Sequence, residues 1–157
     1  MTWNHGGSMT TIDIRLAEEG DFFGWLPLFE AYCRFYETEL DDRKALTVWT
    51  WLQDEQHPLR AALAVDAEGT PVGLAHFRAV PDTLSATTGV YLDDLYVAEE
   101  VRGSGAGRAL IEFVHARSAE LGQGGVSWIT AADNEAAQAL YDRIARRTSW
   151  VTYEMDA

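Results

Sequence analysis

The glycine-rich segment of residues 102–108 is the stretch of this sequence whose residue types and spacing indicate chemistry most clearly. It reads Arg-Gly-Ser-Gly-Ala-Gly-Arg, with glycine at every second position from 103 to 107. Glycines spaced in this way let the backbone curl so that successive N–H groups point into one concavity. The predicted helix that follows adds the partial positive charge of its N-terminus, and such a concavity binds phosphate oxygens. The segment therefore predicts a phosphate-bearing ligand.

Three kinds of phosphate-binding loop have this composition, and their spacing separates them. The dinucleotide fingerprint G-x-G-x-x-G requires glycine at position 108, where Arg108 stands. A Walker loop requires Gly-Lys-Ser/Thr, a triplet that the sequence does not contain. The spacing Arg102-x-x-Gly105-x-Gly107 fits instead, and it resembles the R/Q-x-x-G-x-G/A pyrophosphate loop of the GNAT acetyltransferases.

The resemblance to this family continues from about residue 90 to residue 145. Residues 91–97 resemble the family's fourth strand, residues 109–111 its third helix and residues 128–130 its fifth strand. Asn134, Ala137 and Tyr141 match the family's N-x-x-A-x-x-x-Y pattern, and this spacing is expected to place Asn134 and Tyr141 on one helix face about 10 Å apart. A glycine-rich turn alone is as often a tight connection, but the additional matches favour the functional interpretation.

The resemblance implies acetyl-CoA as the acetyl donor. In the family, the pantetheine arm lies between the splayed fourth and fifth strands and bonds to their backbone, while the loop amides hold the pyrophosphate. Arg102 or Arg108 is expected to add charge-assisted contacts. The predicted cofactor-binding residues are Leu95, Tyr96, Val97, Arg102, Gly103, Ser104, Gly105, Ala106, Gly107, Arg108, Asn134, Ala137 and Tyr141.

Acetylation of an amine requires a proton acceptor, because an ammonium with a pKa near 10.4 has no free lone pair. Asp93 occupies the place of a carboxylate implicated in amine deprotonation in the similar diamine acetyltransferases, and Asp94 is the neighbouring candidate. Successive strand residues face opposite sides, so we expect one of them, Asp93, to face the cleft. Direct transfer to a normal aspartate is uphill by about 9 kcal/mol, which favours a water relay. Tyr141 matches the family's general acid for the departing thiolate.

The acceptor is expected to lie against the first two helices, which form the substrate wall in this family. The predicted substrate-binding residues are Tyr32, Phe35, Tyr36, Glu37, Asp94 and Trp128. An aromatic stripe at helical spacing is also typical of a core, and His76 is expected to be a hairpin residue and not a base. Residues 140–151 lack the usual Gly-Phe ending and resemble the yeast histone and D-amino-acid acetyltransferase group. That resemblance implies a small amine, amino acid or basic peptide acceptor and a homodimer paired through C-terminal strands.

Composition and charge narrow the function classes. The chain has 157 residues, of which 47% are hydrophobic and 24% charged, as in a globular domain. A net charge of −13 favours a cationic substrate over nucleic acid. The single cysteine, Cys33, predicts neither a disulfide nor a metal motif. No apolar run is long enough for a membrane span and no signal peptide is recognised, so we expect a cytoplasmic protein.

Hydrophobic periodicity predicts a mixed α/β fold. Residues 1–11 are expected to be a flexible extension, with Met9 as a possible natural start, before a single domain of residues 12–157. Strands are expected at 12–16, 61–65, 72–77, 90–97, 126–130 and 150–155, and helices at 22–40, 42–53, 107–121 and 134–145, with a loop at 81–89. The resemblance implies a sheet of about six to seven strands flanked by about four helices.

The sequence leaves the acceptor open. Acetylation of a small amine is the leading hypothesis, and acetylation of protein lysines or N-termini is the related one. A non-catalytic acyl-CoA-binding module is the alternative from a different class.

Overall fold

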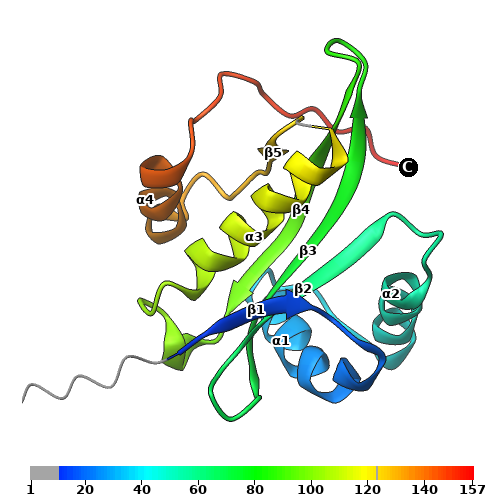
Figure 1. Ribbon diagram of the computed structural model, residues 1–157, viewed down its shortest axis with the longest axis vertical. Helices are drawn as coiled ribbons and strands as arrows, with labels where there is room; N and C mark the ends of the chain where they lie inside the picture. Colours follow the sequence, from blue (N-terminus) through cyan, green and yellow to red (C-terminus); the bar gives the residue numbers. More distant parts are fainter. Residues whose placement is uncertain (1–10, 123) are drawn as a thin grey trace, which may run out of the picture.

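The computed structural model describes residues 11–122 and 124–157, in which a five-stranded sheet carries helices on both faces (Figure 1). The predicted extension, apart from residue 11, lies outside the described residues. The sheet order is β1-β2-β3-β4-β5, antiparallel except for the parallel pair β4 and β5. The strands are β1 (Asp13–Leu16), β2 (Leu59–Val65), β3 (Pro71–Asp82), β4 (Thr87–Val97) and β5 (Val126–Ser127). The helices are α1 (Phe22–Phe35), α2 (Asp42–Gln53), α3 (Ala106–Leu121) and α4 (Glu135–Ile144), with short 3-10 turns η1 (Glu19–Asp21) and η2 (Glu99–Val101).

The core consists of two layers, one on each face of the sheet. Strand β2 is buried on both faces, and its side chains alternate between the two layers. Leu63 packs with Trp25 and Phe29 of α1 on one face, in a cluster that α2 also borders. On the opposite face, Ala62 packs with Leu110 of α3. Helix α3 crosses β3 and β4, and α4 lies beyond it on the side of β5 (Figure 1). The mixed α/β fold is thus confirmed.

Helix α1 is shorter than the predicted 22–40 because a left-handed residue ends it. Glu37 has a φ of 54°, the backbone N–H of Thr38 donates to the carbonyl of Cys33, and that of Glu37 donates to the carbonyl of Arg34. This pair of bonds satisfies the last carbonyls of the helix and reverses the chain. Asp41 then caps α2, where its carboxylate accepts the backbone N–H of Lys44 at 2.8 Å.

The predicted loop at 81–89 is largely strand. Strand β3 continues to Asp82 and β4 begins at Thr87, so that a short turn joins one long hairpin. Asp82 accepts the backbone N–H of Leu84 at 3.0 Å, and Ala86 adopts a left-handed φ of 55°. Side-chain capping and one strained residue make the turn without glycine or proline at its tip.

The C-terminal end of the sheet is smaller than expected. Strand β5 covers two of the predicted residues 126–130, and its pairing depends on a close approach at Gly124, where a Cβ would lie 2.4 Å from the backbone nitrogen of Gly89. No strand forms at 150–155 within the described chain, which accounts for five strands in place of six or seven. A strand requires a neighbouring edge for its backbone groups, and the tail pairs with none here. None of the described helices has the length and apolar character needed to cross a membrane.

Candidate functional site

Strands β4 and β5 separate soon after they meet. Their register joins Val90 to Val126 and Tyr91 to Ser127, and no later pair follows among the described residues. The part of β4 from Leu92 to Val97 therefore has an unpaired backbone edge on the β5 side. This is the splay that the family resemblance implied, and Leu95, Tyr96 and Val97 lie along it.

The glycine-rich segment lies between the end of β4 and α3, as predicted. Gly103 and Gly105 adopt φ values of 83° and 89°, which glycine reaches without strain. The amides of Gly103, Gly105, Gly107 and Arg108 have no acceptor within the described part of the chain. Two of them belong to the first turn of α3, where a helix leaves its N–H groups unpaired. The segment thus presents donors and a helix N-terminus together, which suits a diphosphate.

The two arginines of the segment differ in how they are held. Arg102 donates from Nε to the carbonyl of Val97 at 3.2 Å, and its guanidinium lies 5.7 Å from the ring centre of Tyr96. Arg108 pairs with Glu112 at 2.8 Å on the exposed surface of α3. Arg102 therefore ties the loop to the end of β4, whereas Arg108 remains exposed to solvent beside the loop.

Asp93 and Asp94 share one face of the sheet, contrary to the expectation that only one faces the cleft. His76 pairs with Asp94 and Phe77 pairs with Leu92, so that Asp93 is an extra residue, a β-bulge. Arg78 binds Asp93 and His76 binds Asp94, and residues two apart on β3 point to the same side. The bulge therefore turns both carboxylates towards the side of α1.

Asp93 is the more constrained of the two. Both of its oxygens lie 3.1 Å from Nε of Arg78, whose guanidinium also lies 5.1 Å from the ring centre of Tyr91. Burial raises the pKa of Asp93, and the hydrogen bond and charge of Arg78 oppose that rise. An arginine thus already occupies the carboxylate that the sequence favoured as the base.

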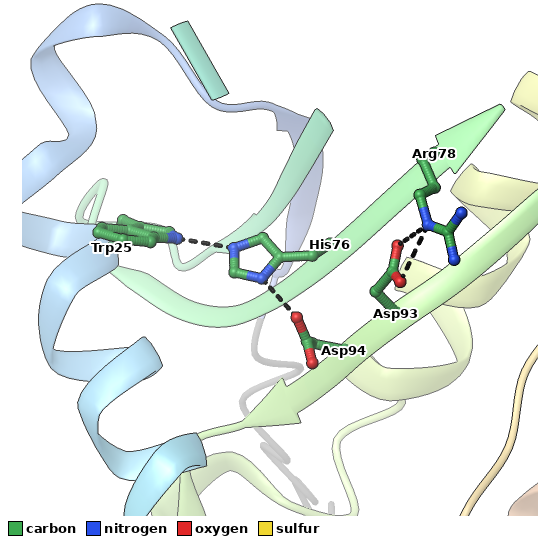
Figure 2. A network of polar contacts seen from close by, with 5 residues as sticks. All are labelled: Trp25, His76, Arg78, Asp93 and Asp94. Atoms are coloured by element: carbon green, nitrogen blue, oxygen red, sulfur yellow. Dashed lines mark hydrogen bonds and ion pairs between the residues drawn. The ribbon is translucent and has the colours of Figure 1, made fainter. Parts of the chain in front are cut away.

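Asp94 is held by a buried histidine (Figure 2). One carboxylate oxygen lies 2.9 Å from Nδ1 of His76, and Nε1 of Trp25 donates to Nε2 of the same ring at 2.9 Å. The sequence pattern did not indicate Trp25 or Arg78, and it predicted His76 to be a hairpin residue outside the site. The sequence contains one relevant signal: His76 and Arg78 are two residues apart on β3, so they point to the same face. Its use depends on the register of the hairpin and the position of the bulge.

Two pairs of aromatic side chains come from three parts of the chain, and Tyr32 of α1 is the member next to Asp94. The ring of Tyr32 lies 5.0 Å from that of Tyr36, which follows α1, and the rings of Trp128 and Tyr141 lie 5.3 Å apart. Burial, followed by the charge of Asp94 and hydrogen bonding with it, raises the pKa of Tyr32. Burial also raises the pKa of Tyr141, and the second cause is Tyr36. The structure therefore brings α1 next to α4 at this site.

Four other predicted residues are placed differently. Phe35 is exposed and contacts the ring of Tyr36, and Glu37 is the left-handed residue that ends α1. Asn134 accepts the backbone N–H of Ala137 at 3.3 Å, so this pair caps α4. The structure gives these four a defined structural position without a contact to Asp93 or Asp94.

A large hollow lies between β5, α3, α4 and the C-terminal tail. Its volume is about 1440 Å³, and Arg108, Trp128 and Tyr141 line it together with Trp150 and Val151 of the tail. Sites for small ligands have volumes of about 300–1,000 Å³. The hollow is therefore larger than a typical site for a small ligand, and it extends beyond the predicted site to the C-terminal tail.

Comparisons with known proteins identify the family and the fold. The sequence profile described as the acetyltransferase (GNAT) family matches residues 25–145. The D-amino-acid N-acetyltransferase HPA3 of Saccharomyces cerevisiae is 37% identical over 144 residues, which cover 91% of this chain and 89% of that protein. The ribosomal-protein-alanine N-acetyltransferase of Brucella melitensis is similar in structure, with a TM-score of 0.78, 23% identity, and coverage of 94% and 99%. The aminoglycoside N-acetyltransferase AAC(6')-Iy, in complex with CoA, has a TM-score of 0.77 at 19% identity, with coverage of 94% and 95%.

Proposed function

Because the chain belongs to the GNAT acetyltransferase family, we propose that its site transfers the acetyl group of acetyl-CoA to the primary amine of a small molecule. The observation that carries the proposal is the position of Asp94, which lies beside Tyr32 at the side of the opening between β4 and β5. Amine acetylation by acetyl-CoA requires a proton acceptor and a site for the phosphates of the cofactor. Strand β4 carries the first, and the loop between β4 and α3 provides the second.

GNAT acetyltransferases use acetyl-CoA, and the residues of this chain suit it. The unpaired amides of Gly103, Gly105, Gly107 and Arg108 would hold the diphosphate. The backbone edge of β4 at Leu95 and the N–H of Val97 would hold the pantetheine arm by strand-like hydrogen bonds, while the carbonyl of Val97 accepts Arg102. Bound acetyl-CoA supplies an acetyl group activated as a thioester.

We assign the proton acceptor to Asp94 in place of Asp93. Arg78 binds both oxygens of Asp93, whereas His76 binds one oxygen of Asp94. The amine nitrogen uses its lone pair to attack the acetyl carbon, and its proton passes to Asp94 through water. Acetyl-CoA and the amine are bound at the same time during attack and proton transfer, so the reaction proceeds through a ternary complex.

Tyr141 is proposed to donate its phenolic proton to the departing sulfur. Burial raises its pKa, so the phenol remains protonated at neutral pH. For an ordinary tyrosine and thiol, full transfer costs about 2 kcal/mol. The raised pKa increases that cost, which fits a proton that moves as the C–S bond breaks and not before.

An amino acid is the acceptor class that we favour among small amines. The similar yeast protein is named for D-amino acids, and the site contains a cation suited to a carboxylate. Arg78 uses Nε for Asp93, and its terminal nitrogens have no hydrogen-bond partner among the described residues. A guanidinium binds a carboxylate in bidentate fashion. Asp94 would then face the amino group and Arg78 the carboxylate of one substrate.

A thiol-release assay across a panel of amines tests the acceptor. The panel contains D- and L-amino acids, the matching decarboxylated amines, polyamines and lysine peptides. Turnover of amino acids above decarboxylated amines, reduced selectively by Arg78→Gln, supports the assignment. Turnover of peptides alone refutes a small-amine acceptor, and no turnover with any amine favours an acyl-CoA-binding module.

The tail supports a homodimer. Trp150, Tyr153 and Met155 have exposed fractions of 87%, 90% and 97%, and exposed apolar side chains in such a row are costly in water. Residues 150–155 also have the pattern of a strand without a partner edge. A second copy would provide one and would cover these side chains. A cytoplasmic location remains a prediction of the sequence.

A further inference from the structure

His76 has a hydrogen-bond partner at each ring nitrogen, and these partners fix its tautomer. The indole N–H of Trp25 can only donate, so Nε2 of His76 must accept it. A neutral imidazole carries one proton, and that proton is therefore on Nδ1, where it is donated to Asp94 at 2.9 Å. The chain Trp25 to His76 to Asp94 thus has a single direction of donation (Figure 2).

A second proton on the ring would disrupt this chain. Protonation of Nε2 would place its N–H against the N–H of Trp25, and two donors cannot share a bond. His76 is 1% exposed and Trp25 is fully buried, so water cannot replace the lost partner. The geometry therefore favours His76 as a neutral donor and opposes its action as a base.

Packing against α1 also prevents the ring from turning away. The ring of Phe29 meets that of His76 edge to face, with the ring centres 5.1 Å apart. Trp25 and Phe29 both belong to α1, which also carries Tyr32 beside Asp94. One helix thus fixes the histidine and lines the acceptor side of the carboxylate.

We propose that His76 is a positioning residue, which holds the carboxylate of Asp94 in the orientation that receives the amine proton, and that Trp25 maintains the required tautomer. The proposal rests on the proposed role of Asp94. Asp94 has two carboxylate oxygens. A fixed hydrogen bond from His76 to one of them directs the other towards the amine substrate. The hydrogen bonds from Trp25 to His76 and from His76 to Asp94 connect α1 to the proton acceptor. An amine that binds against α1 therefore does not displace the carboxylate of Asp94.

Steady-state kinetics with separate kcat and KM values test the proposal. Loss of a hydrogen bond to a charged group predicts a decrease of about 10- to 100-fold in kcat for His76→Leu, and loss of the bond from Trp25 that orients the ring predicts a smaller decrease for Trp25→Phe. The KM for acetyl-CoA should not change, because its loop lies elsewhere. His76→Asn should recover most of kcat, since its side-chain N–H can occupy the place of Nδ1–H. Trp49→Phe is the matched control, because it alters packing on the indole of Trp25 without removing either hydrogen bond.

The outcomes separate this proposal from the function on which it rests. A lowered kcat for Asp94→Asn together with unchanged kcat for His76→Leu and Trp25→Phe overturns the positioning role and leaves the acetyltransferase assignment intact. An unchanged kcat for Asp94→Asn overturns both roles. If Trp49→Phe lowers kcat as much as Trp25→Phe, packing alone explains the effect and the role of the Trp25 hydrogen bond is wrong.

Nitrogen NMR of the histidine ring provides a readout that loss of stability would not imitate. In the ¹⁵N-labelled protein, His76 should show a protonated Nδ1 and an unprotonated Nε2. Trp25→Phe should shift the Nε2 resonance and leave Nδ1 protonated, because Nε2 loses its donor while the carboxylate of Asp94 can still only accept. A ring protonated at Nε2 in the unaltered protein would refute the proposal directly.

Discussion

Asp93 and Asp94 are consecutive residues of β4, and both carboxylates lie on the face of the sheet that α1 covers. Arg78 binds the first and His76 binds the second, from two positions on the same face of β3. The charge of Asp94 is one of the factors that raise the pKa of Asp93, after burial and against Arg78. One bulge thus places two carboxylates with different partners on one face of the sheet.

The difference between these carboxylates predicts unequal effects of matched substitutions. Asp94→Asn removes the proton acceptor and should lower kcat about 100-fold or more. Asp93→Asn retains a group that can accept the Nε–H of Arg78, so it should lower kcat far less and act on KM for the acceptor. Both variants are compared in the thiol-release assay, with thermal unfolding as the control for folding. A larger loss of kcat in Asp93→Asn would return the catalytic role to Asp93.

The raised pKa of Tyr141 predicts that kcat does not change with pH in the alkaline range. A general acid acts only while it is protonated, and raising the pKa moves its loss of function above the ordinary value of 10.0. With Tyr141 intact, kcat should not decline between about pH 8 and about pH 10. Tyr141→Phe should lower kcat about 100-fold throughout. A decline of kcat well below pH 10 that Tyr141→Phe abolishes would contradict the direction of the shift.

Two glycines of the loop predict opposite results when alanine replaces them. Gly105 has a φ of 89°, so Gly105→Ala should cost about 1–2 kcal/mol and weaken coenzyme A binding. Gly107 lies within α3, where an added Cβ would meet Leu140 and Val97 at an ordinary 3.6 Å. Gly107→Ala should therefore retain binding and increase helix stability by up to about 1 kcal/mol. Isothermal titration calorimetry with coenzyme A measures both, and equal loss of affinity would count against a backbone effect.

Glu37 and Ala86 are the described non-glycine residues with positive φ, which makes them a matched pair. Replacement of either by glycine should stabilise the protein by about 1 kcal/mol, because glycine adopts this conformation without strain. Thermal unfolding measures that gain. If Glu37 contacts the acceptor, Glu37→Gly alone should raise KM for the amine, while Ala86→Gly leaves it unchanged. Unaltered KM in both variants would remove Glu37 from the substrate-binding residues.

The exposed tail predicts that the protein forms a dimer which depends on residues 148–157. Light scattering coupled to size-exclusion chromatography should give twice the chain mass for the full chain. A variant ending at Arg147 should be monomeric, because it lacks Trp150, Tyr153 and Met155. A full chain that remains monomeric at micromolar concentration would rule out this interface.

The sequence alone determined the loop, the helix after it and the class of chemistry. Glycine spacing, the position of Arg102 and the Asn134 to Tyr141 interval are local properties, so they could be read without knowing which distant segments meet. The order of strands and helices followed from periodicity for the same reason. The end of α1 and the extent of the long hairpin were missed because single residues in left-handed conformations, Glu37 and Ala86, set them without glycine.

Only the tertiary structure decided which side chains form the site. Trp25 and His76 are 51 residues apart and His76 and Asp94 are 18 apart, so no local pattern connects them. The bulge at Asp93 placed two consecutive carboxylates on one face where opposite faces were expected, because one unpaired residue shifts the alternation of a strand. Our proposal of Asp94 over Asp93 therefore rests on pairing register and on packing against α1, which are long-range properties of the fold.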